Sequence, residues 1–217
     1  MSRLSASGWP CAYSRAIVDL PTPGGPLSRI RRGTIAMYVA RRDHGEVTPT
    51  RPATLEDGRA LAELLRVNRE FLAPWDPIRG DDYYTDDSQL ALLREALDGR
   101  ERGTALTHVI LAEDGRVVGR ITLSGIVRGP FQSCSVGYWV AASDNGRGLA
   151  TAALAHLKQL AFGELGLHRI EAGALLHNVR SQRVLERNGF VRFGVAPEYL
   201  SIAGRWQDHV MYQVLSR

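Results

Sequence analysis

The sequence is poor in cysteine, almost free of lysine and without a long hydrophobic run. Cys11 and Cys134 are its two cysteines, too few for the disulfide framework of a small secreted domain, so we expect a reducing, cytoplasmic location. No run reaches the roughly 18 apolar residues of a membrane-spanning helix, so no membrane partner is expected. Since no Cys-x-x-Cys, His-x-His or His-Glu-x-x-His spacing occurs, we predict no metal site.

The net charge of +4, from 27 basic and 23 acidic residues, suggests nucleic-acid binding until the charges are located along the chain. Residues 1–45 contain seven arginines and two aspartates, whereas residues 46–217 contain 20 basic and 21 acidic residues. Lys158 is the single lysine, and the composition of a GC-rich genome accounts for the arginines better than selection for phosphate contacts does. We therefore predict no nucleic-acid partner.

The first 45 residues differ in composition from the rest. They contain four prolines and five glycines, and the proline-rich segment 21–26 excludes a helix or a central strand there. The apolar segment 16–20 is too short for the core of a signal peptide. We predict an N-terminal extension over 1–45, disordered or preceding a later start at Met37, with a functional basic arm as a further alternative. One domain over 46–217 follows.

The hydrophobic pattern of the domain predicts an α/β protein of the α+β type. The expected order is β-α-α-β-β-β-α-β-α-β-β. Strands are expected at 47–52, 108–112, 116–126, 133–140, 169–176, 190–202 and 206–215, and helices at 54–72, 85–99, 148–163 and 181–187. Thr54 and Thr85 are the expected N-caps of the first two helices, and Gly99 is expected to close the second.

The segment after the strand at 133–140 carries the clearest chemical signal. A glycine-containing turn at 145–148 leads into a helix, so backbone N–H groups at a helix N-terminus are free to bind an anion such as a phosphate. Gly146 and Gly148 allow close approach, and Arg147 adds positive charge. The segment lacks the Lys of a P-loop and the third glycine of a dinucleotide fingerprint. Two interpretations of this segment remain: an acetyl-CoA loop, in which a pyrophosphate binds to the turn, and a turn that binds no ligand.

Two segments resemble the cofactor elements of the GNAT acetyltransferase superfamily. Asn145-Gly146-Arg147-Gly148-Leu149-Ala150 resembles its signature Gln/Arg-x-x-Gly-x-Gly/Ala, with Asn in the first position. Asn178-Val179-Arg180-Ser181, with Asn188-Gly189-Phe190 after it, is similar to the superfamily's Asn-x-x-Ser element and following turn. The segments 68–77 and 206–209 are similar to the ribosomal-protein-alanine N-acetyltransferase branch. The resemblance covers roughly residues 47–215.

The resemblance implies a mixed, mostly antiparallel sheet of about seven strands, splayed at the acetyl-CoA site and flanked by about four helices. It implies direct transfer of acetyl from acetyl-CoA to an amine, and the sequence shows no Ser-His or Cys-His nucleophile signature. The residues that it assigns to CoA are Trp139 and Val140 (pantetheine and thioester), Asn145, Gly146, Arg147, Gly148, Leu149, Ala150 and Thr151 (diphosphate), and Asn178 and Ser181.

Two catalytic groups of many relatives are absent from this chain. Leu185 stands where many relatives have the Tyr that serves the leaving thiolate, so Ser181 is our candidate for that role, with Asn178 holding the pantetheine. The alternative for Asn178 and Ser181 is helix capping. Ser135 stands where many relatives have a Glu that serves as base. The candidate bases are then Glu70, Glu198, Asp208 and His209.

Substrate is expected to bind between the loop at 71–84 and the final hairpin. The candidate contacts are Trp75, Tyr83, Tyr84, Tyr199, Trp206 and Asp208. For the aromatic residues the alternative is anchoring of the loop, and for Asp208 and His209 it is a structural pair on the last strand. The acidic residues at 81–82 and 86–87 form either a solvated helix start or a surface that attracts a basic tail.

The resemblance makes an N-acetyltransferase the leading hypothesis, acting on the N-terminal amine (Ala or Ser) of a protein such as a ribosomal protein. An α-amino group, with a pKa near 8, is about one-tenth neutral at pH 7, whereas a lysine amine is less than about a thousandth neutral. The alternatives are acetylation of a small amine such as an aminoglycoside or a polyamine, and a non-enzymatic acetyl-CoA sensor. A monomer or a homodimer is expected.

Overall fold

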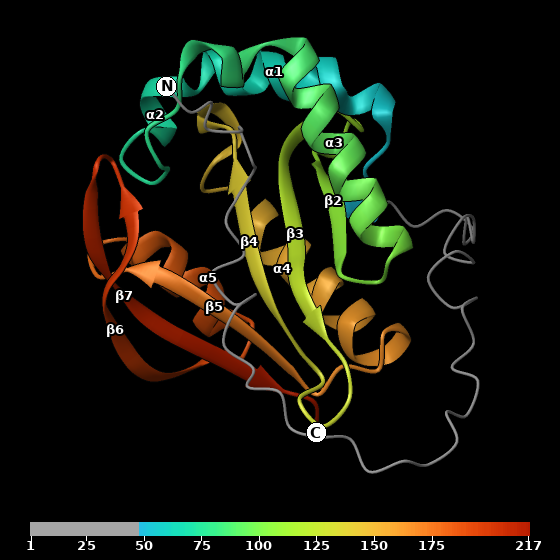
Figure 1. The fold of residues 1–217 in the computed structure, drawn as a ribbon, viewed down its shortest axis with the longest axis vertical. Helices are drawn as coiled ribbons and strands as arrows, with labels where there is room; N and C mark the ends of the chain where they lie inside the picture. The colour runs from blue at the N-terminus through green and yellow to red at the C-terminus, as the bar shows by residue number, and fades with distance from the viewer. Residues whose placement is uncertain (1–47) are drawn as a thin grey trace, which may run out of the picture.

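The computed structural model describes residues 48–217. The predicted N-terminal extension lies outside the described residues, so the boundary at residue 45 stays a prediction. Within the described part, seven strands form one sheet in the order β1-β2-β3-β4-β5-β7-β6 (Figure 1). The strands are β1 (Thr50–Pro52), β2 (Ala105–Leu111), β3 (Val117–Val127), β4 (Ser133–Val140), β5 (Arg169–Leu175), β6 (Val191–Ile202) and β7 (Arg205–Leu215).

Five α-helices flank this sheet. They are α1 (Gly58–Val67), α2 (Arg69–Leu72), α3 (Asp86–Glu101), α4 (Leu149–Gln159) and α5 (Val179–Arg187). Short 3-10 helices lie at Leu55–Asp57 (η2), Asp81–Tyr84 (η3) and Ala142–Asp144 (η4), and a π-helix, η5 (Leu160–Glu164), continues α4. No helix of the described residues is long and apolar enough to cross a membrane.

The predicted order of strands and helices is confirmed, and the ends of three helices differ from the prediction. The first predicted helix is divided at Asn68 into α1 and α2. Gly99 does not close α3, which continues to Glu101. Gly99 is instead a packing position, because a Cβ there would lie 3.2 Å from the Cβ of Ala105. The last turn of the predicted helix at 148–163 is the π-helix η5, in which the N–H of Leu165 donates to the carbonyl of Leu160.

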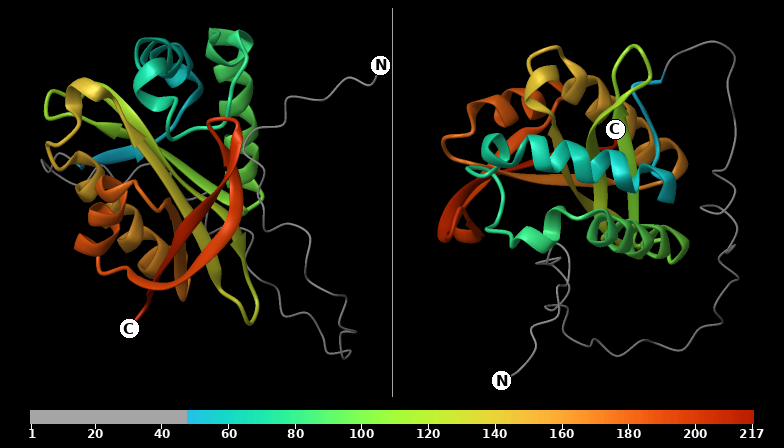
Figure 2. Two further views of the ribbon diagram at one scale, coloured as in Figure 1. Left: turned by 90° about the vertical axis from the view of Figure 1, so that its left-hand side faces the viewer. Right: turned by 90° about the horizontal axis from the view of Figure 1, so that it is seen from above.

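The sheet separates two layers of helices (Figure 2). Helices α4 and α5 cover one face, where Leu154, Leu157 and Leu185 join the larger core. Helices α1 and α3 cover part of the other face, where Leu61 and Leu93 pack on Val109 of β2. The first helical turn is tied to the edge strand, because Asp57 accepts hydrogen bonds from the Thr54 N–H at 2.8 Å and from the Arg51 guanidinium at 2.6 Å. The predicted capping role of Thr54 is thereby confirmed.

The two halves of the sheet diverge between β4 and β5. These strands are parallel and pair at three positions, from Ser133 opposite Arg169 to Ser135 opposite Glu171. Beyond Ser135, β4 continues antiparallel to β3 as far as Val140, whereas β5 continues beside β7. Figure 1 shows the two strands close together near the C-terminus and separating toward α1. The splayed, mostly antiparallel sheet that the resemblance implied is therefore present.

A buried polar group links the edge of the sheet to α4. The Thr50 hydroxyl lies 2.9 Å from Nδ1 of His108 and 2.8 Å from Nδ1 of His156. A hydroxyl has one proton, so it donates to one imidazole and accepts from the other, and the imidazole that accepts must be neutral at Nδ1. Burial, with the neighbouring His156, lowers the pKa of His108 to about 3, and burial also lowers the pKa of His156.

We predict that acid destabilises the fold through these two histidines. Their pKa values are lower in the folded than in the unfolded chain, so the unfolded chain binds more protons below about pH 6.5. The free energy of unfolding, measured with urea from pH 7.5 to pH 4, should fall by up to about 1.4 kcal/mol per pH unit for each such histidine. His108→Gln should flatten that slope even where it lowers the stability itself. An equal slope in the variant would contradict the prediction.

Candidate functional site

The turn between β4 and α4 presents an open row of backbone N–H groups. Gly146 and Gly148 have φ angles of +81° and +82°, and a Cβ built on either would meet nothing within 4 Å. Residues 145–148 are exposed, and α4 begins directly after them at Leu149. The helix N-terminus therefore faces free space that a diphosphate could fill, with no side chain of the turn blocking the approach.

Two buried side chains hold this turn in place, and sequence reasoning missed both. Asn68, at the break between α1 and α2, accepts a hydrogen bond from the N–H of Ala142 at 2.7 Å and donates to the Leu64 carbonyl. Asp144 forms an ion pair with Arg147 at 3.1 Å. No spacing in the sequence singles out either residue, because Asn68 acts over a separation of 74 positions. The ion pair fixes the Arg147 side chain beside the exposed turn.

The splay leaves one edge of β4 unpaired by β5 from Val136 to Val140. Trp139 and Val140, predicted to lie along the pantetheine arm, belong to this edge. Backbone groups of an unpaired edge can pair with an extended ligand as they would with another strand. The edge leads directly into the turn at 145–148, so one extended molecule could contact both.

The N-terminus of α5 lies across the splay from β4. Asn178 is the N-cap of α5, and its side chain accepts a hydrogen bond from the Ser181 N–H at 3.1 Å. The capping alternative for Asn178 is therefore present in the structure, while its role toward a cofactor stays a prediction. The Ser181 hydroxyl lies 3.1 Å from the hydroxyl of Tyr138 on β4. The sequence placed Tyr138 on the strand segment expected to pair with the pantetheine arm, 138–140, and predicted no role for its side chain.

On β5, at the other side of the splay, one backbone position is exposed. Gly173, in the middle of β5, is exposed, although its neighbours Ala172 and Ala174 are buried in the core. A Cβ on Gly173 would make ordinary contacts, at 3.5–3.6 Å, with Met211, Tyr199 and His209. The structure thus brings Tyr199 and His209 together, with ring centroids 5.3 Å apart, beside the exposed Gly173.

The His209 imidazole is prepared to accept a proton at Nε2. Nδ1 of His209 lies 2.9 Å from the carbonyl oxygen of Gln207, an acceptor only, so Nδ1 carries the hydrogen and Nε2 the lone pair. Burial lowers the pKa of His209, against the raising effects of the Gln207 carbonyl and Asp208, which keeps the ring neutral near pH 7. The buried thiol of Cys134, by contrast, has its pKa raised to about 12 by burial and stays protonated.

Glu198 lies at an irregularity of the β6–β7 hairpin. The pairing register shifts between Ala196 and Leu200, and Glu198 has a φ angle of +44°, a conformation that residues other than glycine rarely adopt. Asp208 accepts a hydrogen bond from the Glu198 N–H at 2.9 Å. Asp208 therefore supports the bulge, which gives it a structural role, and its predicted contact with substrate is not tested. Bulges of this kind often direct a side chain toward an active site.

The loop between α2 and α3 has contacts at both of its ends, with the segment before α5 and with α1. At one end, the Trp75 ring lies 5.4 Å from that of His177, which directly precedes Asn178. The backbone of this loop is joined to the β6–β7 hairpin, because the N–H of Ala203 donates to the carbonyl of Asp76. Asp76 is itself largely buried, which raises the pKa of its carboxyl despite nearby Arg79 and Arg120. No spacing in the sequence singled out Asp76.

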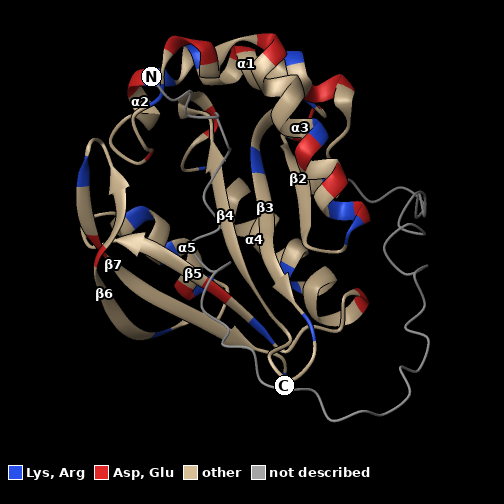
Figure 3. Cartoon of the chain, in the orientation of Figure 1, with Lys and Arg blue, Asp and Glu red and all other residues tan. Residues whose placement is uncertain are grey.

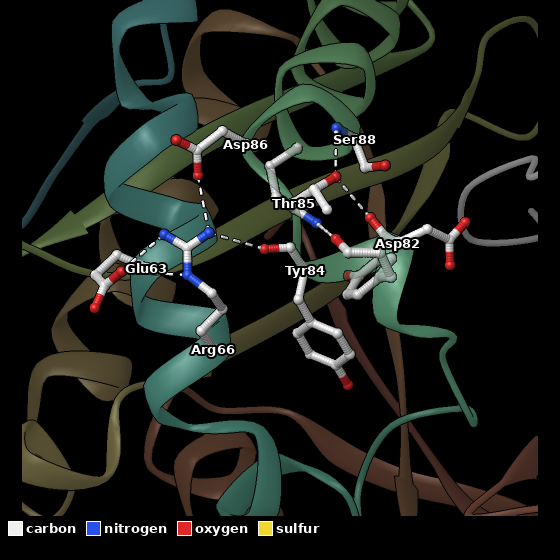
Figure 4. A network of polar contacts seen from close by, with 9 residues as sticks. Glu63, Arg66, Asp82, Tyr84, Thr85, Asp86 and Ser88 are labelled. Atoms are coloured by element: carbon white, nitrogen blue, oxygen red, sulfur yellow. Dashed lines mark hydrogen bonds and ion pairs between the residues drawn. The ribbon is translucent and has the colours of Figure 1, made fainter.

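At its other end, the loop is held by Arg66 of α1 (Figure 4). This guanidinium contacts Glu63 at 2.7 Å, Asp86 at 2.9 Å and the Tyr84 carbonyl at 3.2 Å. The guanidinium of Arg69 lies over the Tyr84 ring, with its Cζ 4.6 Å from the ring centroid. These contacts anchor the loop, which is the alternative that the sequence left open for its aromatic residues.

The remaining predicted residues are dispersed. Glu70 is exposed on α2, and no hydrogen bond or ion pair among residues 48–217 joins it to His209 or Ser181. Trp206 is 65% exposed at the hairpin tip. In Figure 3, where the ribbon is coloured by residue type, acidic and basic residues are frequent on α1 and α3 and few on the sheet. The described residues contain no cluster of His, Cys, Asp or Glu that could hold a metal ion.

Comparison with known proteins identifies a family and several relatives of this chain. Residues 50–191 match the family described as Acetyltransferase (GNAT) domain. The chain is 35% identical over 173 residues to a probable N-acetyltransferase, YjcK, of Bacillus subtilis, covering 79% of this chain and 96% of that protein. It is 33% identical over 156 residues to the [ribosomal protein uS5]-alanine N-acetyltransferase of Escherichia coli, covering 71% of this chain and 80% of that protein.

A solved structure has the same fold. The structure of Mycobacterium smegmatis RimJ in complex with CoA-disulfide superposes with a TM-score of 0.74 at 32% identity, covering 77% of this chain and 81% of that one. That protein was solved in complex with CoA-disulfide.

Proposed function

The chain belongs to the GNAT acetyltransferase family and is an N-acetyltransferase; from this premise, we propose that it transfers acetyl from acetyl-CoA to the N-terminal α-amine of a protein. The substrate class is a basic protein that begins with Ala or Ser, such as a ribosomal protein. Similarity to the E. coli enzyme named for ribosomal protein uS5 supports this choice. A cytoplasmic location and a monomeric or homodimeric state are parts of the same proposal.

The observation that supports the substrate class is the exposed surface of β5 at Gly173. Gly173 is exposed there, beside Tyr199 and His209 of the hairpin. An accessible surface admits the end of a polypeptide, whereas a polyamine or an aminoglycoside is usually held in a more enclosed site. The acidic residues at 81–82 and 86–87, at the starts of η3 and α3, could attract the basic tail of such a protein.

The chain's residues fit acetyl-CoA, which supplies an activated acetyl thioester when bound. The open N–H groups from Asn145 to Thr151 would hold the diphosphate, with Arg147 adding charge. The unpaired edge at Trp139 and Val140 would orient the pantetheine arm and bind the thioester oxygen through backbone N–H groups. Asn178 and Ser181 would contact the arm from the α5 side, and the Ser181 hydroxyl would donate to the leaving sulfur.

The proton of the attacking amine is taken by a group on the β6–β7 hairpin. His209 has a neutral ring with its Nδ1 hydrogen engaged, and Glu198 is directed by a strained bulge beside it in the hairpin. Either group acts on the side of β5 where Gly173 leaves room for substrate. An α-amine, with a pKa near 8, asks less of such a base than a lysine does.

The activity itself can be tested with a basic peptide that begins with Ala and contains an internal lysine. We expect acetylation at the N-terminus, located by mass spectrometry, with a kcat/KM at least about tenfold above that for the lysine amine, because more of the α-amine is neutral at pH 7. The same peptide with its N-terminus already blocked is the control. Acetylation of lysine alone, faster turnover of spermidine or an aminoglycoside, or CoA binding without any turnover would each refute the proposal.

The position of the diphosphate can be tested at Gly148. We expect Gly148→Asp to abolish acetyl-CoA binding in calorimetry, since it adds a carboxylate where the N–H groups face open space. The matched control is Gly129→Asp in the β3–β4 connection. Gly129 has a φ angle of +71° and equally open surroundings, so this variant carries a similar backbone strain away from the site. Retained affinity in Gly148→Asp, or equal loss in both variants, argues against the placement.

The base can be identified from the pH dependence of three variants, Glu198→Gln, His209→Gln and Glu70→Gln. We expect one of the two hairpin variants to lower kcat/KM on the order of 100-fold at pH 7, with the loss shrinking by pH 9. The recovery is expected because the α-amine deprotonates unaided above its pKa near 8. A pH-independent loss would indicate a structural role. Recovery with pH in Glu70→Gln alone would place the base on α2 instead.

A further inference from the structure

We propose that Tyr138 is the positioning residue for Ser181: its hydroxyl donates to Oγ of Ser181 and so directs the Ser181 hydrogen at the leaving sulfur. This inference rests on the proposed function of Ser181 and adds a residue and a hydrogen-bond direction to it. Tyr138 touches neither the acetyl group nor the amine in this arrangement. It acts through Ser181.

The geometry points to this role because Tyr138 crosses the splay. It lies on β4 beyond Ser135, where β5 no longer pairs with that strand. Its hydroxyl lies 3.1 Å from Oγ and 3.2 Å from the backbone carbonyl of Ser181, at the first turn of α5. Tyr138 is partly buried and packs against the larger core, which restricts the direction of its ring.

The two distances allow two arrangements of the protons. A phenol has one hydrogen to donate, so Tyr138 donates either to the carbonyl oxygen or to Oγ of Ser181. In the first arrangement the tyrosine oxygen accepts the Ser181 hydrogen, which then points at Tyr138 and is not available to another acceptor. In the second, Oγ accepts from Tyr138, and its own hydrogen is free to donate to a group in the splay. A hydroxyl that accepts a hydrogen bond also becomes a better donor.

The charge that develops in the reaction selects the second arrangement. The amine nitrogen forms a bond to the acetyl carbon while the carbon–sulfur bond breaks, and the electron pair of that bond remains on sulfur. The amine proton passes to the base on the hairpin. Sulfur leaves as a thiolate, for which an ordinary thiol pKa is about 8.5, so it needs a hydrogen bond rather than a full proton transfer. It takes its proton from solvent after release.

Tyr138 is suited to donating without losing its own proton. Burial raises the pKa of its hydroxyl to about 12, and the hydrogen bond with Ser181 offsets this only in part. A phenol that stays protonated across the working pH range remains a hydrogen-bond donor to Oγ of Ser181 throughout that range. Ser181 therefore presents one donor direction instead of rotating among several.

A double-mutant cycle tests the proposal. Tyr138→Phe should lower kcat roughly 3- to 10-fold, the factor one neutral hydrogen bond is worth, with little change in the KM for acetyl-CoA. In the Ser181→Ala background the same change should have no further effect, because its target is gone. A purely structural role, through the Ser181 carbonyl, predicts an equal loss in both backgrounds, and that result would overturn the proposal.

The control is Tyr212→Phe, which removes another buried hydroxyl that contacts α5. The Tyr212 hydroxyl lies 3.2 Å from the carboxylate of Glu186 and does not contact Ser181. Its loss should leave kcat within about twofold, since it adds no donor at the sulfur. A kcat loss in Tyr212→Phe equal to that in Tyr138→Phe would show a general effect of loosening α5, and would count against the proposal.

A binding measurement separates this proposal from the proposed function. The thiol of bound CoA can be titrated by its ultraviolet absorbance as pH rises. Tyr138→Phe should raise the pKa of that thiol, and Tyr212→Phe should not. An unchanged thiol pKa in Tyr138→Phe overturns the role of Tyr138 even if the enzyme is active. A raised one supports it even if no N-terminal peptide is acetylated, in which case the substrate assignment alone fails.

Discussion

The parallel pairing between β4 and β5 is the constraint on which the rest of the site depends. It lasts for three residue pairs and then ends, so two well-bonded half-sheets share one edge and diverge from it. Backbone groups along β4 lose their partner strand there, at a depth where unpaired polar groups are costly unless a ligand or water satisfies them. The cofactor site that we propose is thus a consequence of the sheet's topology, and side chains refine it.

Because the strands no longer hold the two halves together at the splay, side chains do so. Asn68 fixes the start of the β4–α4 turn from the break between α1 and α2, and Tyr138 reaches from β4 to the first turn of α5. The Trp75–His177 contact and the bond from Ala203 to Asp76 connect the substrate loop with the second half-sheet. The opening between the halves is therefore bounded by polar and aromatic contacts instead of a continuous ladder.

The sequence sufficed for elements that local chemistry determines. Thr85 caps α3 through the Ser88 N–H, and Gly146 and Gly148 adopt the positive φ angles that their turn suggested. It failed where a residue's role depends on a distant partner. Gly99 resembles a helix stop, yet it is there for close packing on Ala105. Asn68, Asp76 and Tyr138 gain their roles from partners that only the folded chain brings near, and no spacing encodes those pairs.

The π-helix at the end of α4 has a consequence for the connection to β5. A π-turn contains one more residue than an α-turn, and Leu160–Glu164 forms such a turn. The next described element is β5, so the extra residue changes only the point at which the chain leaves the helix. The turn at 145–148 lies at the opposite end of α4, and a change in the length of the α4–β5 connection can be absorbed at η5 without moving that turn.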